Sequence, residues 1–156
     1  MASELRVDKI HNEGGDNDTG LDLSTNDQIV LKTANTTRLT MNATGQTTIV
    51  GEGGSTTTNL QGGLAKAWLQ AADSASVRDS INIASGTDDG TGQYTYAFTN
   101  SFSNDDYAPT VTTVVAEVSA TGNVLTSAFD IFTFLRTDSF AYEDQVNYAS
   151  VHGDLA

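Results

Sequence analysis

The chain of 156 residues contains no cysteine and only one proline. The absence of cysteine excludes both a disulfide framework and thiol chemistry. Basic residues are also scarce: 7 Lys and Arg stand against 20 Asp and Glu, for a formal net charge of −13. Because lysine and arginine are the residues that neutralise phosphate groups, this balance argues against nucleic acid and against an anionic membrane surface as partners.

Long apolar runs are missing as well. No stretch approaches the roughly 20 apolar residues that a membrane span needs, so we expect no membrane insertion. The segment 1–6 lacks the apolar core of a signal peptide. These features predict a protein that is made in a cytoplasm.

The first sixty residues lack aromatic side chains altogether, and the six Phe, five Tyr and one Trp all lie from Trp68 onward. A segment this polar is too poor in apolar surface to close a core of its own as a monomer. Its short apolar pairs recur every eight to ten residues or so, which is typical of short strands and tight turns. We therefore predict a core shared between chains and lined by Leu21, Leu23, Ile29, Leu31, Leu39 and Met41.

The segment 51–59 is rich in glycine, serine and threonine, which is typical of a linker. This segment ends a fibrous β region at 1–59, which is expected to serve as shaft and attachment region, and a second domain follows at 60–156. The second domain shows about six apolar, alternating segments, with turns predicted at 85–92 and 120–123. This rhythm predicts an all-β chain whose C-terminal domain is a small antiparallel β-sandwich.

The most distinct local pattern is a predicted hairpin. Val77, Ile81 and Ile83 alternate with polar residues, as in a half-buried strand, and the same alternation returns over 94–98. Between these segments, 85–92 carries three glycines and two aspartates, which favour a turn.

Four motifs in this half of the chain occur in a recognisable order: Ala67-Trp68, then 77–83, then Thr87 to Tyr94, then Asp106-Tyr107. In this order they resemble the distal tip domain of bacteriophage tail fibres. The segment 37–46 is similar to a repeat of phage fibre shafts.

The resemblance implies a homotrimeric virion protein that is not an enzyme. Its N-terminus would bind other tail or capsid proteins, and its C-terminal tip would recognise a host-surface receptor, either a glycan or a protein. The alternative is a capsid-bound decoration or head-fibre protein with a purely structural role. A depolymerising enzyme is a weaker candidate, since the chain is too short for the large β-helix that such enzymes use.

The acidic segment that includes Asp16, Asp18 and Asp22 is the candidate metal site. Calcium is bound by six to eight oxygen atoms in flexible geometry, which alternating carboxylates can supply. The alternative is a solvated acidic turn, and no other cofactor is expected. No serine lies in a nucleophile elbow, and His11 and His152 lack a zinc-binding spacing, so nothing in the sequence favours catalysis.

Exposed aromatic residues are the candidate receptor contacts. We expect Trp68, Tyr96 and Phe98 to build the core of the C-terminal domain. Loops, by contrast, concentrate binding residues, and three aromatic residues lie in segments without strand periodicity. The predicted receptor-binding residues are therefore Tyr107, Phe140, Tyr142 and Glu143.

Overall fold

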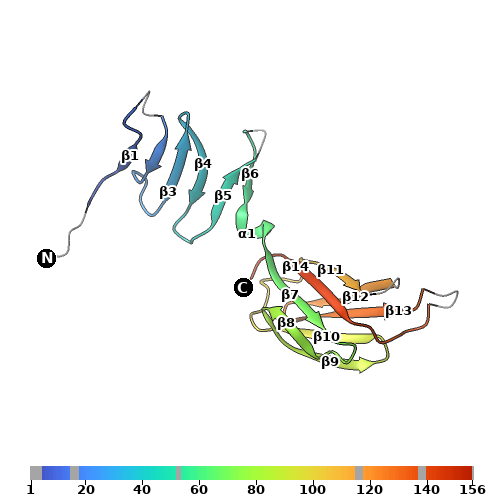
Figure 1. Ribbon diagram of the computed structural model, residues 1–156. Helices are drawn as coiled ribbons and strands as arrows, with labels where there is room; N and C mark the ends of the chain where they lie inside the picture. Colours follow the sequence, from blue (N-terminus) through green and yellow to red (C-terminus); the bar gives the residue numbers. More distant parts are fainter. Residues whose placement is uncertain (1–4, 15–17, 52–53, 115–117, 137–139, 156) are drawn as a thin grey trace. The chain divides into compact units, whose positions relative to one another are not determined.

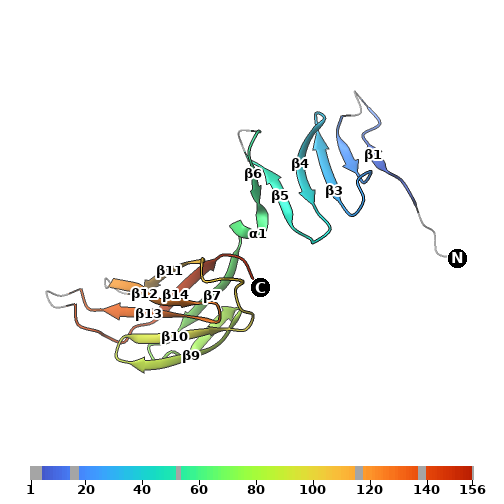
Figure 2. The same ribbon diagram turned by 180° about the vertical axis from the view of Figure 1, so that it is seen from behind.

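The computed structural model describes residues 5–14, 18–51, 54–114, 118–136 and 140–155 (Figures 1 and 2). The chain forms two compact units, Met1–Gly62 and Gly63–Ala156. Both are built from antiparallel strands, which confirms the predicted all-β class. Within the described ranges, no helix has the length and apolarity to cross a membrane.

The N-terminal unit is one antiparallel sheet in which each strand pairs with the next strand along the chain (Figure 1). One turn of helix, α1 (Leu60–Gly63), follows the sheet. A tight hairpin turn at Ala34 and Asn35 joins the third and fourth strands of this sheet. Both turn residues have positive φ, and a two-residue turn of this kind has the backbone twist that paired strands require. In order, the strands are β1 (Lys9–His11), β2 (Gly20–Asp22), β3 (Ile29–Thr33), β4 (Thr36–Met41), β5 (Thr47–Val50) and β6 (Thr57–Asn59).

One face of this sheet carries an apolar row that crosses five strands in direct register. We name it by its residues, Ile10, Leu21, Leu31, Leu39 and Ile49, each of which lies opposite the next.

Ile29 and Met41, which also pair with each other, extend the apolar row on the same face, and Leu23 lies half-buried just after β2. The described residues of this unit supply no second layer, so Leu31 remains 44% exposed. The six residues predicted to line a shared core are therefore only partly covered within one chain, and their burial between chains stays a prediction.

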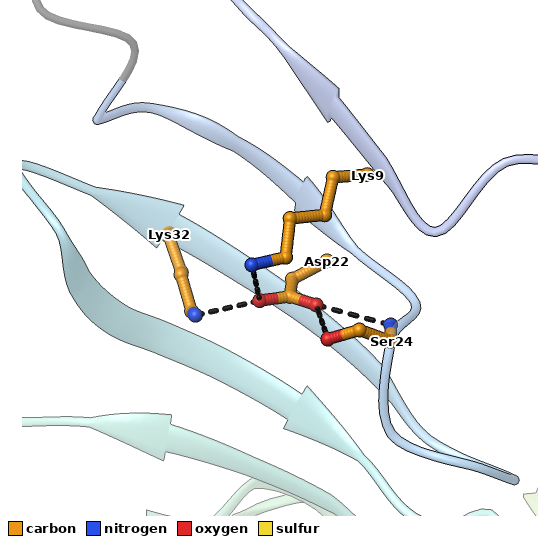
Figure 3. A network of polar contacts seen from close by, with 4 residues as sticks. All are labelled: Lys9, Asp22, Ser24 and Lys32. Carbon is orange, nitrogen blue, oxygen red and sulfur yellow. Dashed lines mark hydrogen bonds and ion pairs between the residues drawn. The ribbon is translucent and has the colours of Figure 1, made fainter.

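The opposite face carries a polar network around Asp22 (Figure 3), beside Val30, which is 8% exposed. The carboxylate of Asp22 lies 2.7 Å from the Lys32 ammonium and 3.6 Å from that of Lys9. It also accepts hydrogen bonds from the backbone N–H and the hydroxyl of Ser24. The hydrogen bond from Lys32, followed by those from Ser24, holds the pKa of Asp22 far below its ordinary value of 3.8. One face of this sheet thus carries the partly exposed apolar row, and the other carries the ion-paired Asp22 next to the buried Val30.

We expect Asp22→Asn to destabilise the protein in a pH-dependent way. Because the folded state lowers the pKa of Asp22, its contribution is full above the ordinary value of 3.8. That contribution is lost as the pH falls below about 4 toward the lower pKa of the folded state. Chemical unfolding followed by circular dichroism should show the two proteins differing most near neutral pH and converging in acid. Asp8→Asn, at an exposed position just before β1, is the control. A stability difference that stays constant through acid would contradict the expectation.

The C-terminal unit is a sandwich of two four-stranded antiparallel sheets. One sheet has the order β12-β13-β10-β9 and the other has the order β11-β14-β7-β8. The core cluster takes side chains from both sheets. The strands are β7 (Ala65–Ala71), β8 (Val77–Ile81), β9 (Ile83–Gly90), β10 (Gln93–Phe98), β11 (Ala108–Thr113), β12 (Val118–Leu125), β13 (Ala128–Phe134) and β14 (Asn147–His152).

The predicted hairpin is wrong in its partners. Strand β9 occupies most of the expected turn, and it pairs with β10 around a tight turn at Thr91-Gly92. Gly86 serves a close approach: a Cβ there would lie 2.1 Å from the carbonyl oxygen of Ala75 and 2.8 Å from the Tyr96 ring. The glycine at position 86, which favours a turn in the sequence, is therefore needed in a strand where there is no room for a side chain.

The chain changes sheets at Asn82, between β8 and β9. Asn82 has a φ of 58°, and it is hydrogen-bonded to Asn100 in both directions. Within β8 the register against β7 shifts between Val77 and Asp79, so Val77 packs against the core while Ile81 is exposed. After the change of sheet, Ile83 packs against the core again. The turn predicted at 120–123 is also wrong, because these residues lie within β12, where the register shifts between Thr121 and Val124. A glycine inside a strand often marks such a bulge.

The core of the sandwich is aromatic. Phe129 is fully buried, with its ring centroid 5.9 Å from that of Tyr96 and 5.5 Å from that of Phe98. The Tyr96 hydroxyl accepts a hydrogen bond from Asn147 of the other sheet, and burial raises the pKa of Tyr96 to about 12. The predicted core positions of Tyr96 and Phe98 are confirmed, whereas Trp68 is only half-buried and lies outside the core cluster.

Tyr107 is a core residue, contrary to the prediction that it lies exposed on a loop. It is 7% exposed and packs on Phe102, with ring centroids 4.4 Å apart. Its hydroxyl lies 2.8 Å from both the carbonyl oxygen of Leu125 and that of Ala128. Burial raises the pKa of Tyr107 to about 12. The tyrosine thus anchors the β10–β11 connection to the core and is removed from the receptor-binding set.

Candidate functional site

An aromatic surface lies on the outer side of β13 and on the segment that follows it. We define it as Phe132, Phe134 and Tyr142, together with the exposed Phe140 two residues before Tyr142 in the chain. Ile131 and Thr133 on the same strand are buried. Because side chains alternate along a strand, Phe132 and Phe134 point away from the core.

Tyr142 completes this surface by packing on both phenylalanines of β13. Its ring centroid lies 4.7 Å from that of Phe134 and 6.1 Å from that of Phe132. Tyr142 nevertheless remains 44% exposed, and Phe140 is 58% exposed. Phe140 also has a φ of 44°, which is rare for an aromatic residue and is a kind of strain that clusters at functional positions.

The segment that carries Tyr142 is fixed to the end of the sandwich by backbone hydrogen bonds. The N–H of Leu135 donates to the carbonyl oxygen of Ala141, and the N–H of Thr133 donates to that of Gly92, both at 2.9 Å. The N–H of Gly92 donates to the carboxylate of Asp144 at 2.7 Å. Gly92 has a φ of 63°, and a Cβ there would lie 2.5 Å from the Thr133 carbonyl oxygen. The aromatic surface is thus presented by a bonded segment with a pre-formed shape.

Glu143 is half-buried and belongs to this fixing segment. Its N–H donates to the carbonyl oxygen of Thr133 at 3.2 Å, and its own carbonyl oxygen accepts from the Thr133 hydroxyl. One of its carboxylate oxygens is closed to solvent and has no hydrogen-bond partner among the described residues. Glu143 therefore holds the backbone in place and keeps one acceptor unsatisfied.

A polar network borders the aromatic surface on the same sheet. Asp130 is two residues before Phe132 and therefore points to the same side. Its carboxylate accepts hydrogen bonds from the Thr95 hydroxyl at 2.9 Å and from the Asn123 side-chain amide at 2.7 Å. The Thr95 hydroxyl also lies 2.6 Å from the carboxylate of Asp89. Flat apolar rings beside fixed hydrogen-bonding groups can bind a ligand that has an apolar face and a polar edge.

Of the four predicted receptor-binding residues, Tyr142 packs on the rings of β13, and Phe140 is exposed two residues before it in the chain. The structure places Glu143 beside them in the chain and Tyr107 in the core. The sequence prediction missed Phe132 and Phe134 as members of the site. Asp130 could have indicated them: a charged residue is expected on the outward side of a strand, and Phe132 and Phe134 follow it at alternate positions on that same side.

The predicted calcium site is not supported by the positions of its residues. Asp16 lies outside the described residues. The Asp22 carboxylate is engaged by two lysine ammonium groups, and that of Asp18 accepts a hydrogen bond from the Thr19 hydroxyl. Across the described part of the chain, no group of three or more His, Cys, Asp or Glu side chains is arranged to hold a metal ion.

These features define an all-β protein with a pre-formed aromatic surface on a β-sandwich. Comparisons with protein-family models, with curated proteins and with solved structures found no match.

Proposed function

We propose that this chain is a fibre-type structural protein of a bacteriophage particle whose C-terminal sandwich binds a ligand on the host surface. The observation that carries the proposal is the aromatic surface, with Tyr142 and Phe140 exposed on a segment held by backbone hydrogen bonds. Exposed apolar patches with polar borders are typical of binding sites. The motifs that resemble phage fibre tips support the particle context.

The N-terminal unit supports the same proposal in a different way. The apolar row of this sheet is only partly buried within one chain. A sheet with one exposed apolar face can bury that face by packing against copies of itself. We propose a homotrimer, with other tail or capsid proteins bound through the N-terminus. Three copies of one weak site raise the overall affinity through effective concentration.

The ligand class follows from charge and shape. At a net charge of −13, the protein is repelled by acidic cell surfaces, so attraction at long range does not drive the encounter. Contact must come from stacking and hydrogen bonding, which fits a glycan or a protein loop on the host. On the particle, antibody labelling should find the chain on the tail or the capsid surface.

We expect Tyr142→Ala to weaken adsorption of the fluorescently labelled full-length protein to susceptible cells by about tenfold, which corresponds to about 1.4 kcal/mol. The Tyr142 ring packs on Phe134 and Phe132 and is itself exposed, so removing it takes away the ring that a ligand would contact. Phe140→Ala should weaken adsorption in the same direction.

Leu125→Ala, which removes an exposed apolar side chain elsewhere on the sandwich, is the matched control and should leave adsorption unchanged. If the wild-type protein binds no cell to which the particle itself adsorbs, the receptor role is wrong. The chain would then belong with decoration or head-fibre proteins, where self-association alone is the function.

A further inference from the structure

A second surface lies on the outer side of the other sheet, around the single tryptophan. Two cross-strand rows run there over the same strands. In the first row, Ser150 of β14 lies between Thr110 of β11 and Trp68 of β7. In the second, Tyr148 takes the equivalent place between Thr112 and Gln70. Their neighbours Leu69, Ala149 and Val151 are buried, so the two rows point away from the sandwich core.

Because these side chains differ in size, they leave an open groove of about 330 Å³ between them. This volume is near the lower end of the roughly 300–1,000 Å³ that small-molecule sites occupy. Trp68 and Tyr148 are diagonal neighbours across the two strands, and the small side chain of Ser150 lies beside both. Large rings therefore wall the groove, while a serine leaves its centre open. The lining residues are Trp68, Leu69, Thr110, Thr112, Tyr148, Ala149 and Ser150.

The lining of the groove is mostly apolar, and two of its hydroxyl groups are held by neighbouring side chains. The side-chain amide of Gln70 donates to the Tyr148 hydroxyl at 3.3 Å, and the Ser150 hydroxyl lies 3.3 Å from Nε2 of His152. The exposed side chains of Thr110 and Thr112 add further hydroxyl groups along one side. None of the lining residues is charged, although the chain carries 27 charged side chains, 20 acidic and 7 basic.

We propose that this groove binds one uncharged sugar ring. A pyranose has an apolar C–H face that can stack on Trp68 or Tyr148 and a rim of hydroxyls that can both donate to and accept from threonine, serine and glutamine side chains. A charged ligand would find no counter-charge in the lining. The site lies on the opposite sheet from the aromatic surface, so the inference does not rest on the receptor role proposed for Tyr142.

Trp68, as the only tryptophan, reports directly on the groove. We expect its fluorescence emission in the full-length protein to change saturably with at least one member of a panel of neutral hexoses and N-acetylhexosamines. Ethylene glycol at matched concentration should give no saturation. The same protein on an array of immobilised glycans should prefer neutral terminal residues to acidic ones.

Ser150→Val keeps a residue that is well suited to a strand but fills the centre of the groove, and we expect it to raise the Kd for the sugar at least tenfold with the tryptophan reporter intact. Tyr148→Ala is the second variant and should weaken binding without filling the groove. Tyr142→Ala should leave the titration unchanged, which separates this site from the aromatic surface.

Three results would overturn the proposal. The first is a folded wild-type protein that responds to no neutral sugar on either assay. The second is a response that the Ser150→Val and Tyr148→Ala variants both retain. The third is Trp68 emission that shifts with protein concentration in the absence of sugar, because that would place Trp68 at a contact between copies of the chain.

Discussion

Replacing Leu31 with aspartate is expected to dissociate the proposed homotrimer into monomers. Leu31 lies at the middle of the apolar row, between Leu21 and Leu39. An unpaired carboxylate in a dry interior costs several kcal/mol, and the change would enter a shared core once per chain. In a lone chain the same position is 44% exposed, where a carboxylate stays hydrated and costs little. A large effect therefore reports on assembly rather than on the sheet itself. Sedimentation velocity at micromolar concentration measures it.

The matched control is Thr40→Asp, which adds the same charge on the other face. Thr40 pairs with Val30 and Thr48, next to the pair formed by Leu31 and Leu39. This variant should sediment like the wild type. Leu39→Ala, a milder change in the apolar row, should leave the assembly intact and lower its stability by about 2–5 kcal/mol for each buried site. A wild-type protein that sediments as a folded monomer would refute the shared core.

Phe129→Ala is expected to unfold the C-terminal unit at a much lower denaturant concentration, with a loss of about 3–5 kcal/mol. The ring is completely buried and contacts both Tyr96 and Phe98, so its removal leaves a cavity in the centre of an aromatic core. For a sandwich of this size, that loss is a large fraction of a total of about 5–15 kcal/mol. Trp68 fluorescence during urea unfolding follows this unit alone, since the N-terminal unit has no aromatic residue.

Phe140→Ala removes the same side chain from a site that is 58% exposed, and it should change the stability by no more than about 0.5 kcal/mol. Equal losses in the two phenylalanine variants would mean that Phe140 is packed in solution, and the aromatic surface would then need to be redrawn without it.

The fold class could be predicted from the sequence because alternation and turn spacing act locally. The strand at 94–98 follows from period two alone. The predictions of turns are wrong where glycine serves a purpose other than turning the chain. The sequence predicts Gly86 in a turn, yet it lies in a strand that passes close to the Tyr96 ring and the Ala75 carbonyl group. Only the packed structure distinguishes a glycine needed for a turn from a glycine needed for space.

The candidate site could be predicted only in part. Phe140 and Tyr142 were identified because no strand pattern buries them. Tyr107 has the same kind of sequence context, yet its hydroxyl reaches two carbonyl oxygens about 20 residues away in the chain, on Leu125 and Ala128. The Trp68 groove was missed because its members come from β7, β11 and β14, and their register across the sheet cannot be read from spacing along the chain.

The N-terminal sheet pairs every strand with its neighbour in sequence and with no other strand in the described part of the unit. Hairpins can therefore be duplicated or deleted inside this unit without rewiring any remaining pair. Each hairpin gained would extend the sheet by two strand spacings, about 9–10 Å, and would lengthen the apolar row by two positions. The width of this sheet thus becomes a quantity that evolution or an engineer can set in fixed steps, while the fold of the sandwich stays as it is.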